Sequence, residues 1–318
     1  MPTTFKTQKS NEKIPQPPPH AQPYAPPPRA TRKRPAIDNH ALALSVTITL
    51  AILVLIGVPI GAILPERYVV KLPINILVPL YLEPESGIKW DRLFEGIIKH
   101  RELNFTVIVD PSNGPSTPPH PGSLYVEAIK RLNVFPNVHT IGYVNIEHAH
   151  RDNATVHREI ATYAGWATET GLALHGIFFD QTPSEDIGDA KQYLKSASAT
   201  VCHSDGFLEP KLVVHNPGRV PNSSLESYHA DVTVVFEGAF EDVPTRDKIR
   251  AQLNDRSGGR SDYAYLVHSM PQENGKIGLR RLINGVRRDI QWLYVTDRKE
   301  NVYGDYSAHW EDFLSLTW

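Results

Sequence analysis

The chain has 318 residues, 41% of them hydrophobic, and a formal net charge of −2. That length suffices for one large domain with additional segments. The charge is uneven: residues 1–39 carry seven Lys and Arg against two acidic residues, residues 40–64 carry no charge, and residues 65–318 are therefore acidic overall. Charge-driven nucleic-acid binding is thus excluded for the main part of the chain. The single cysteine, Cys202, excludes an intrachain disulfide and a cysteine-based zinc site.

Residues 1–39 have the composition of a disordered tail. They contain ten prolines, including the runs 17–19 and 26–28, and offer few apolar side chains to bury. Such a segment favours polyproline conformations and remains solvated. We expect a basic, Pro-rich tail that ends near residue 39.

Residues 40–64 are predicted to form one transmembrane signal-anchor helix. The run 41–64 is uncharged and exceeds the roughly 20 residues that span a bilayer. A cleaved signal peptide is the alternative, but a basic lead of about 39 residues and the lack of a clear cleavage site fit it less well. The cluster Arg32-Lys33-Arg34 precedes the span, so the N-terminus is predicted to be cytosolic and residues 65–318 extracellular or luminal. Sequons at Asn104, Asn153 and Asn222 suit a glycoprotein domain in the secretory pathway, although short sequons also arise by chance.

From residue 74 onward, strand and helix patterns alternate. Strands are predicted at 76–82, 105–110, 140–145, 176–180, 211–216, 232–237, 263–268 and 291–296, and helices at 90–100, 124–132, 155–168, 187–199, 246–253 and 279–286. We read eight strand-then-helix units over about 240 residues, which is the size of a (β/α)8 TIM-type barrel. An open doubly wound sheet is the alternative, disfavoured because no G-x-G-x-x-G follows the first strand.

Polar side chains collect where the predicted strands end. These residues are Tyr81, Asp110, Tyr143 with Asn145, Asp180, Asn216, Glu237, His268, and Thr296 with Asp297. In a parallel barrel the C-terminal strand ends form one mouth, so we expect these side chains to face a common site. Carboxylates, amides and aromatic hydroxyls suit a sugar, whereas a nucleophile elbow and a phosphate-binding glycine loop are both missing.

Two acids stand out because each ends an apolar strand: Asp180 after Gly176-Ile177-Phe178-Phe179, and Glu237 after 232–236. Glycoside hydrolysis needs one carboxyl to protonate the leaving oxygen and one to attack the anomeric carbon or activate water. We assign Asp180 as nucleophile and Glu237 as general acid/base, with a pKa raised by its apolar surroundings. The alternative is that each acid only caps its strand or pairs with an arginine.

At these positions the sequence resembles the spherulin-4 family, whose characterised fungal members are glycoside hydrolases of family 135. The matching segments, in family order, are 78–81, 107–115, 142–144, 176–180, 216–218 and 234–237. The resemblance implies a (β/α)8 barrel, catalysis by the carboxylates at Asp180 and Glu237, and endo-acting hydrolysis of α-1,4-linked galactosamine or N-acetylgalactosamine polymers such as galactosaminogalactan. It also implies a fungal cell-wall or biofilm setting.

Two positions depart from the family pattern. Gln181 stands where the family usually has a glutamate, and a glutamine carries no charge and donates no proton at neutral pH. Asp110 stands where the family usually has an asparagine, which returns a carboxylate to the mouth. We therefore hold two hypotheses: a membrane-tethered endo-glycosidase with Tyr81, Asp110, Tyr143, Asn145, Gln181 and Asn216 around the sugar, or a carbohydrate-binding surface protein of the same fold with weak or no activity. Neither requires a metal or organic cofactor, and a glycosidase of different linkage preference stays open.

Overall fold

A computed structural model describes residues 72–85, 89–225 and 230–318 of the chain. They fall in one compact unit, residues 70–318. The predicted Pro-rich tail and the predicted transmembrane helix lie outside the described residues. Within the described part, no helix has the length and apolar character needed to cross a membrane.

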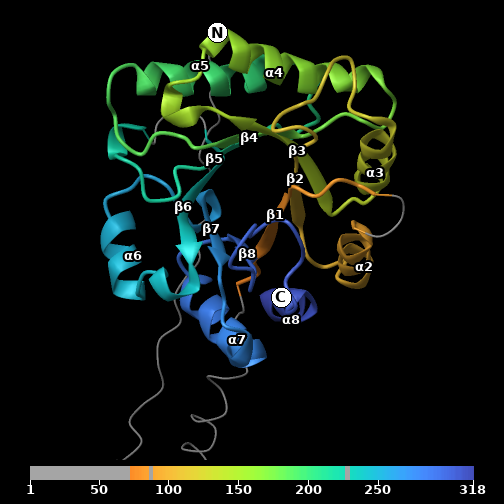
Figure 1. The fold of residues 1–318 in the computed structure, drawn as a ribbon. Helices are drawn as coiled ribbons and strands as arrows, with labels where there is room; N and C mark the ends of the chain where they lie inside the picture. Colours follow the sequence, from red (N-terminus) through yellow and green to blue (C-terminus); the bar gives the residue numbers. More distant parts are fainter. Residues whose placement is uncertain (1–71, 86–88, 226–229) are drawn as a thin grey trace, which may run out of the picture. The chain divides into compact units, whose positions relative to one another are not determined.

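Eight parallel strands close into a barrel in sequence order (Figure 1). The strands are β1 (Asn75–Leu80), β2 (Phe105–Val109), β3 (Val138–Asn145), β4 (Gly176–Asp180), β5 (Leu212–His215), β6 (Val232–Ala239), β7 (Tyr263–His268) and β8 (Trp292–Val295). The barrel closes where β1 pairs with β8, through Asn75 opposite Trp292 and Ile76 opposite Leu293. The predicted (β/α)8 barrel is therefore confirmed. The first and last residues of every strand lie within about three residues of the predicted ones.

The strands form because their residues are apolar on both faces, as a parallel sheet covered by helices requires. All residues of β1 and β2 are buried. Strand β4 needs its first residue to be a glycine: a Cβ at Gly176 would lie 1.8 Å from the carbonyl oxygen of Leu212 on β5. The sequence thus fixes the contact that places Asp180 at the far end of the same short strand.

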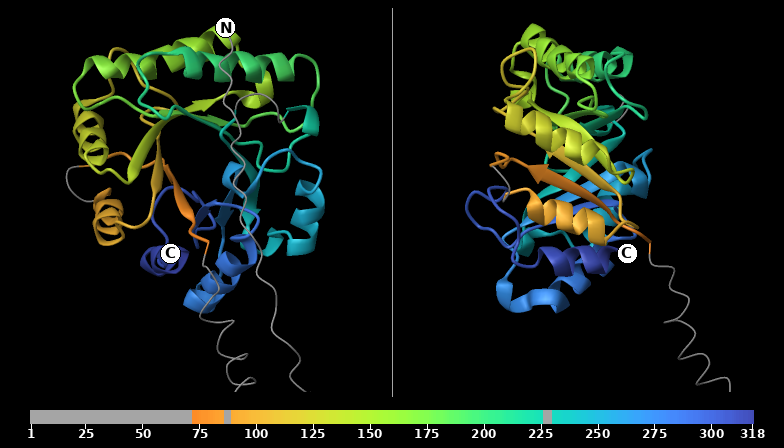
Figure 2. Two further views of the ribbon diagram at one scale, coloured as in Figure 1. Left: turned by 180° about the vertical axis from the view of Figure 1, so that it is seen from behind. Right: turned by 90° about the vertical axis from the view of Figure 1, so that its right-hand side faces the viewer.

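Helices surround the barrel, as both views in Figure 2 show. They are α2 (Asp91–Lys99), α3 (Ser123–Asn133), α4 (Asn153–Gly165), α5 (Ala190–His203), α6 (Arg246–Leu253), α7 (Gly275–Val286) and α8 (Trp310–Thr317). Helix α4 begins at a cap, where the Asp152 side chain accepts the N–H of Thr155 (2.9 Å). It packs closely on β3, since a Cβ at Gly142 would lie 2.7 Å from the ring of Tyr163.

The connection between β5 and β6 departs from a strict strand-then-helix repeat, and no helix was predicted from its sequence. Between β5 and β6 the described residues form only a short 3-10 turn, η3 (Ser223–Leu225). This connection is short and contains Pro217, Gly218 and Pro221, which disfavour a helix. Conversely, α8 was not predicted; it packs beside α7, and a Cβ at Gly96 of α2 would touch its Leu314.

Strand β6 is also less regular than its sequence indicates. Its pairing with β7 shifts register between Val234 and Phe236, so a bulge lies just before Glu237. Bulges re-aim side chains and are common beside active sites. The simple alternation assumed from the sequence therefore does not describe how Glu237 reaches the mouth.

Candidate active site

Asp180 ends strand β4 and is held by two buried donors. The Tyr143 hydroxyl donates to Asp180 Oδ2 (2.8 Å), and the Asn216 side-chain amide donates to Asp180 Oδ1 (2.8 Å). Tyr143 and Asn216 are 5% and 3% exposed, whereas Asp180 is only half-buried. The carboxylate is thus fixed in orientation while it stays partly accessible to solvent at the C-terminal end of β4.

Glu237 on β6 is held in a matching way. The Tyr303 hydroxyl donates to Glu237 Oε1 (2.5 Å), and the Asn216 amide donates to Glu237 Oε2 (2.6 Å). Burial raises the pKa of Glu237 above its usual value, although these two hydrogen bonds oppose the rise. Glu237 therefore keeps a proton to higher pH than an exposed glutamate.

Asn216 joins the two carboxyl groups. Its one amide nitrogen donates both bonds, of 2.8 and 2.6 Å, so the two carboxylate oxygens that it contacts lie at most about 5.4 Å apart. The Asn216 side-chain oxygen accepts the N–H of Gly218 (3.1 Å), which fixes the orientation of the amide. The side chains of Asp180 and Glu237 thus converge across the mouth, as the strand-end pattern predicted.

The rings of Tyr81, Tyr143 and Tyr303 pack against one another beside Asp180 and Glu237, and we call these three residues the tyrosine arch. The Tyr81 ring, at the end of β1, meets Tyr143 edge to face at 5.3 Å and Tyr303 at 5.4 Å. Such contacts between aromatic rings add stability beyond the buried area. Burial and the charge of Asp180 raise the pKa values of Tyr81 and Tyr143, so both hydroxyls stay protonated as donors.

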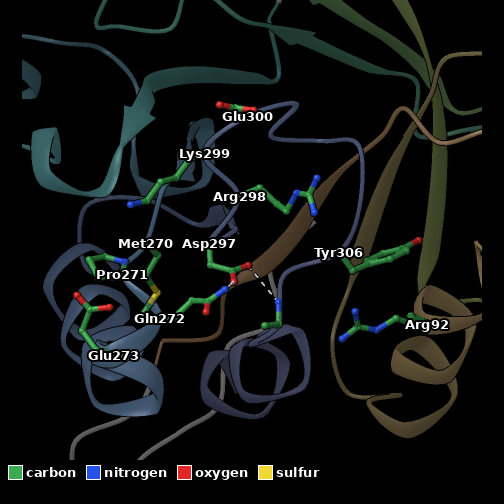
Figure 3. Close-up of a pocket in the computed structure, with 11 residues that line it drawn as sticks. Arg92, Met270, Pro271, Gln272, Glu273, Asp297, Arg298, Lys299, Glu300 and Tyr306 are labelled. Atoms are coloured by element: carbon green, nitrogen blue, oxygen red, sulfur yellow. Dashed lines mark hydrogen bonds between the residues drawn. The ribbon is translucent and has the colours of Figure 1, made fainter.

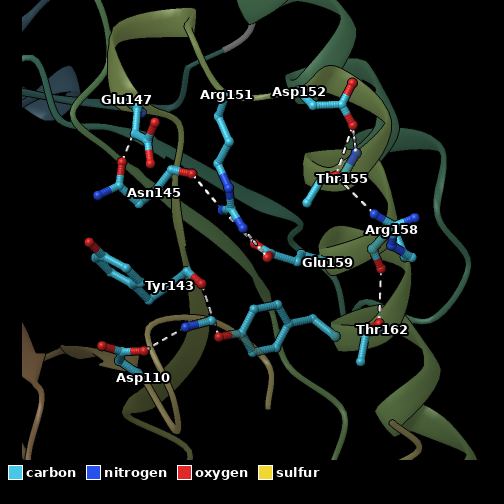
Figure 4. A network of polar contacts seen from close by, with 12 residues as sticks. Asp110, Tyr143, Asn145, Glu147, Arg151, Asp152, Thr155, Arg158, Glu159 and Thr162 are labelled. Atoms are coloured by element: carbon cyan, nitrogen blue, oxygen red, sulfur yellow. Dashed lines mark hydrogen bonds and ion pairs between the residues drawn. The ribbon is translucent and has the colours of Figure 1, made fainter. Parts of the chain in front are cut away.

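Asn145 lies beside Asp180, and its backbone is held by a hydrogen bond from Arg151 (Figure 4). It pairs with Asp180 in the register of β3 and β4. Arg151 Nη1 donates to the Asn145 carbonyl oxygen (2.7 Å) and also binds Glu159 of α4 (2.8 Å). Since Arg151 and Glu159 are both largely buried, this ion pair anchors the loop after β3 to the helix behind it.

Asp110 follows β2 and shapes its own loop, as Figure 4 shows. Asp110 Oδ1 accepts the N–H of Gly114 (2.8 Å). Burial raises the pKa of Asp110 to about 6, and the charge of Asp180 contributes to the rise. An asparagine would accept the same hydrogen bond, so what the aspartate adds at this position is charge.

The Gln181 side chain is exposed and, among the described residues, makes no hydrogen bond. Its backbone is left-handed (φ +50°), and its carbonyl oxygen accepts the N–H of His148 (2.7 Å). Four of the six predicted sugar-site residues lie at the carboxyl pair: Tyr81, Tyr143, Asn145 and Asn216. Asp110 is near enough for the charge of Asp180 to raise its pKa. Gln181 forms its hydrogen bond through its backbone alone.

The loops after the strands carry the backbone strain of the described residues. All eight non-glycine residues with positive φ lie there: Asn113, Ser116, Glu147, His148, Ala149, Gln181, Ser269 and Asn301. Strain of this kind concentrates at functional sites. This observation is independent of the carboxyl pair and points to the same end of the barrel.

Sequence reasoning missed Tyr303. This residue lies in the loop between β8 and α8, 66 positions from its partner Glu237, and no local pattern marks it.

A cavity of about 750 Å³ lies on another side of this loop. It is lined by Arg92, Gln272, Asp297, Arg298 and Tyr306 among others, but by neither carboxylate of the pair (Figure 3). Within the described ranges, no group of three or more His, Cys, Asp or Glu could hold a metal ion.

Comparisons with known proteins identify the family and agree with the barrel fold. The sequence profile of the spherulation-specific family 4 matches residues 75–317. Among solved structures, Aspergillus clavatus Sph3 in complex with GalNAc is 33% identical, with a TM-score of 0.73, over 77% of this chain and 97% of that one. A Bacteroidetes-affiliated GH5 cellulase is 11% identical with a TM-score of 0.49, over 78% of this chain and 90% of that one. No curated protein matches the chain.

Proposed function

This chain belongs to the spherulation-specific family 4, and from that premise we propose that it is an endo-acting glycoside hydrolase of α-1,4-linked galactosamine polysaccharides. The complex of Aspergillus clavatus Sph3 with GalNAc supports a galactosamine-type sugar as ligand, because the two chains share a fold and are 33% identical over their aligned residues. Galactosaminogalactan-like polymers are the proposed substrate class.

The observation that carries the proposal is the pairing of Asp180 with Glu237 through Asn216. Their contacted oxygens lie at most about 5.4 Å apart. Retaining glycosidases separate their two carboxyl groups by about 5–5.5 Å, whereas inverting enzymes need about 6.5–9.5 Å to admit a water. Two carboxyl groups that are bridged by one amide nitrogen resemble the retaining arrangement more than the inverting one, so we propose double displacement with retention of the anomeric configuration.

In the first step, an Asp180 oxygen attacks the anomeric carbon while Glu237 gives its proton to the glycosidic oxygen. The carbon–oxygen bond breaks, the shortened polymer leaves with that proton, and a glycosyl ester forms on Asp180. In the second step, Glu237 takes a proton from water, whose oxygen attacks the same carbon and releases Asp180. Each group returns to its starting protonation state, and no metal or organic cofactor is required.

Asn216 suits this exchange of charge. As the ester forms, Asp180 loses its negative charge and Glu237 gains one. The single Asn216 amide donates to both groups, so the charge moves between two sites that are already hydrogen-bonded. Donors oriented in advance lower the barrier because they need no rearrangement during the reaction.

The second candidate is a carbohydrate-binding protein with weak or no activity. Gln181 favours it, since the family usually places a glutamate there and the glutamine supplies no charge. Against it stand both retained carboxylates with their complete sets of donors. Asp110 returns a negative charge to the mouth, and we propose that this charge offsets the loss at position 181.

We further propose that residues 40–64 anchor the protein in a membrane, with the N-terminus cytosolic and the barrel outside or in a lumen. The sequence supports this through its uncharged 24-residue run after a basic cluster. The sequon residues Asn104, Asn153 and Asn222 are all exposed. Protease protection in membrane vesicles tests the orientation of the chain. The mass of the protein before and after enzymatic removal of N-linked glycans tests whether the sequons are glycosylated.

The decisive experiment incubates galactosaminogalactan with the full chain and, in parallel, with its Asp180→Ala and Glu237→Ala variants. Release of oligosaccharides by the parent alone is the expected result. Binding of the polymer without release would instead support the binding protein. Neither binding nor release would contradict the proposed substrate class.

A further inference from the structure

The loop between β8 and α8, residues 296–309, brings a tyrosine to the proposed general acid. The Tyr303 hydroxyl donates to Glu237 Oε1 at 2.5 Å. The Tyr303 ring packs edge to face on Tyr81, with ring centroids 5.4 Å apart, and lies 6.0 Å from Tyr294. The hydroxyl is therefore aimed by ring packing on two sides.

The same loop is clamped at its base by a buried carboxylate. Asp297 is 8% exposed; its Oδ1 accepts the N–H of Ala308 (3.1 Å), and its Oδ2 accepts a bond from Gln272 Nε2 (2.7 Å) (Figure 3). The first of these bonds joins the two ends of the loop, and the second ties it to the loop after β7. Arg92 Nη2 also donates to the Ser307 carbonyl oxygen (3.2 Å). Tyr303 thus projects from a fixed segment.

From these contacts we infer that Tyr303 is a positioning residue, which orients the Glu237 carboxyl and stabilises its charged form. The inference rests on the proposed function, because it concerns the group assigned there as the general acid/base. Tyr303 is set apart from the other tyrosines of the arch by its partner: Tyr143 holds Asp180, and Tyr303 alone among the described tyrosines bonds to Glu237.

The electrostatic balance at Glu237 explains why this hydroxyl matters. The titratable groups that face it are Asp180 from β4, His268 from β7, Tyr81 directly after β1, and Tyr303. Burial raises the pKa of Glu237, and the charge of Asp180 adds to the rise. The bonds from Tyr303 and Asn216 lower it, because they stabilise the carboxylate that remains after proton transfer. Without these bonds the pKa of Glu237 would rise further, and the glutamate would transfer its proton less readily.

Removing the Tyr303 hydroxyl should therefore shift the pKa of Glu237 in one direction only. In Tyr303→Phe the ring packing on Tyr81 is kept, but the charged form of Glu237 loses one donor and its pKa rises. Glu237 must be protonated for the first step, so the basic limb of the pH profile of kcat/KM should move to higher pH, by roughly one unit for one hydrogen bond to a charged group. The rate at low pH should fall, because a weaker acid transfers its proton less readily.

Tyr306→Phe is the matched control. It removes the same atom from the same loop, at a hydroxyl that is buried and, among the described residues, has no hydrogen-bond partner. Its pH profile should match that of the parent. A Tyr303→Phe profile that falls in height without any shift of its basic limb would overturn the inference, since loss of packing alone would act in that way.

A second measurement does not depend on hydrolysis. The Glu237 carboxyl carbon is titrated by ¹³C NMR in the full chain and in both variants, with Glu237→Gln used to assign the signal. A higher pKa in Tyr303→Phe alone is the expected result, and equal pKa values in all three proteins would overturn the inference. If the pKa rises but no protein cleaves the polymer, the proposed function fails while the role of Tyr303 in holding Glu237 stands.

Discussion

The two ends of the barrel are built from the same eight strands but use polar side chains differently. At the N-terminal ends two asparagines bind backbone carbonyl oxygens: Asn133 donates to Gly171 and Ala173, and Asn137 donates to Leu103. At the C-terminal ends, Asp180 and Glu237 bind other side chains instead. One end therefore fixes the path of the chain, and the other fixes functional groups relative to each other.

The backbone shows the same contrast. Every non-glycine residue of positive φ among the described residues follows the C-terminal end of a strand. Strain persists only where surrounding structure enforces it. The largely buried ion pair Arg151–Glu159 is one such support, because it holds the loop after β3 to helix α4. Changes at the two ends should thus separate activity from stability.

The largest expected effect is at the C-terminal end, in Asp180→Asn. Without a nucleophile the glycosyl ester cannot form, so kcat should fall by roughly 10³-fold or more. Asparagine keeps the size of the side chain, so the melting temperature should change by only about 2–4 °C. Steady-state hydrolysis and a thermal melt check this. Retention of a tenth of the parent rate would contradict the assignment of Asp180.

Glu237→Gln should cost somewhat less, roughly 10²- to 10⁴-fold in kcat, the range of general acid–base catalysis. The loss should depend on the leaving group, because an aryl glycoside with an acidic phenol needs little protonation. Rates on the polymer and on such an aryl galactosaminide provide the comparison. An equal loss on both substrates would point to a structural role for Glu237.

At the opposite end, Arg260→Ala should change stability and leave the chemistry alone. Arg260 donates to the carbonyl oxygen of Arg287 (2.6 Å), to Gln291 Oε1 (2.7 Å) and to the carbonyl oxygen of Pro73. Losing these bonds should lower the free energy of unfolding by about 1–3 kcal/mol. Urea denaturation measures the loss. A shifted pH profile of kcat/KM in this variant would break the division between the two ends.

The smallest expected effect belongs to Gln181→Glu. The side chain is exposed and, in the described part of the chain, forms no hydrogen bond, so kcat/KM should change by about threefold or less, roughly 0.6 kcal/mol. Gln181→Ala serves as the control for side-chain contacts with the polymer. A thirtyfold gain in Gln181→Glu would show that the natural glutamine suppresses activity.

Sequence reasoning found the barrel and both carboxylates because these depend on local patterns. Apolar strands such as Gly176–Asp180 end in one polar residue, and in a parallel barrel such ends meet. The same logic placed Tyr143 and Asn216 at the carboxyl pair. It required no knowledge of which residues are neighbours across the sheet.

The missed features depend on contacts between distant segments. Tyr303 lies in an irregular loop, and only the fold brings it to Glu237. The bulge in β6 follows from pairing with β7. Helix α8 (Trp310–Thr317) depends on packing against its neighbours, which the sequence alone does not reveal.

The most direct test of the central claim is the anomeric configuration of the first product. The full chain is incubated with an α-1,4-linked galactosamine oligosaccharide, and ¹H NMR spectra are recorded before the new reducing end mutarotates. The closeness of Asp180 to Glu237 predicts that the α configuration appears first. Initial formation of the β anomer would contradict double displacement at this carboxyl pair, because inversion requires room for a water between the two acids.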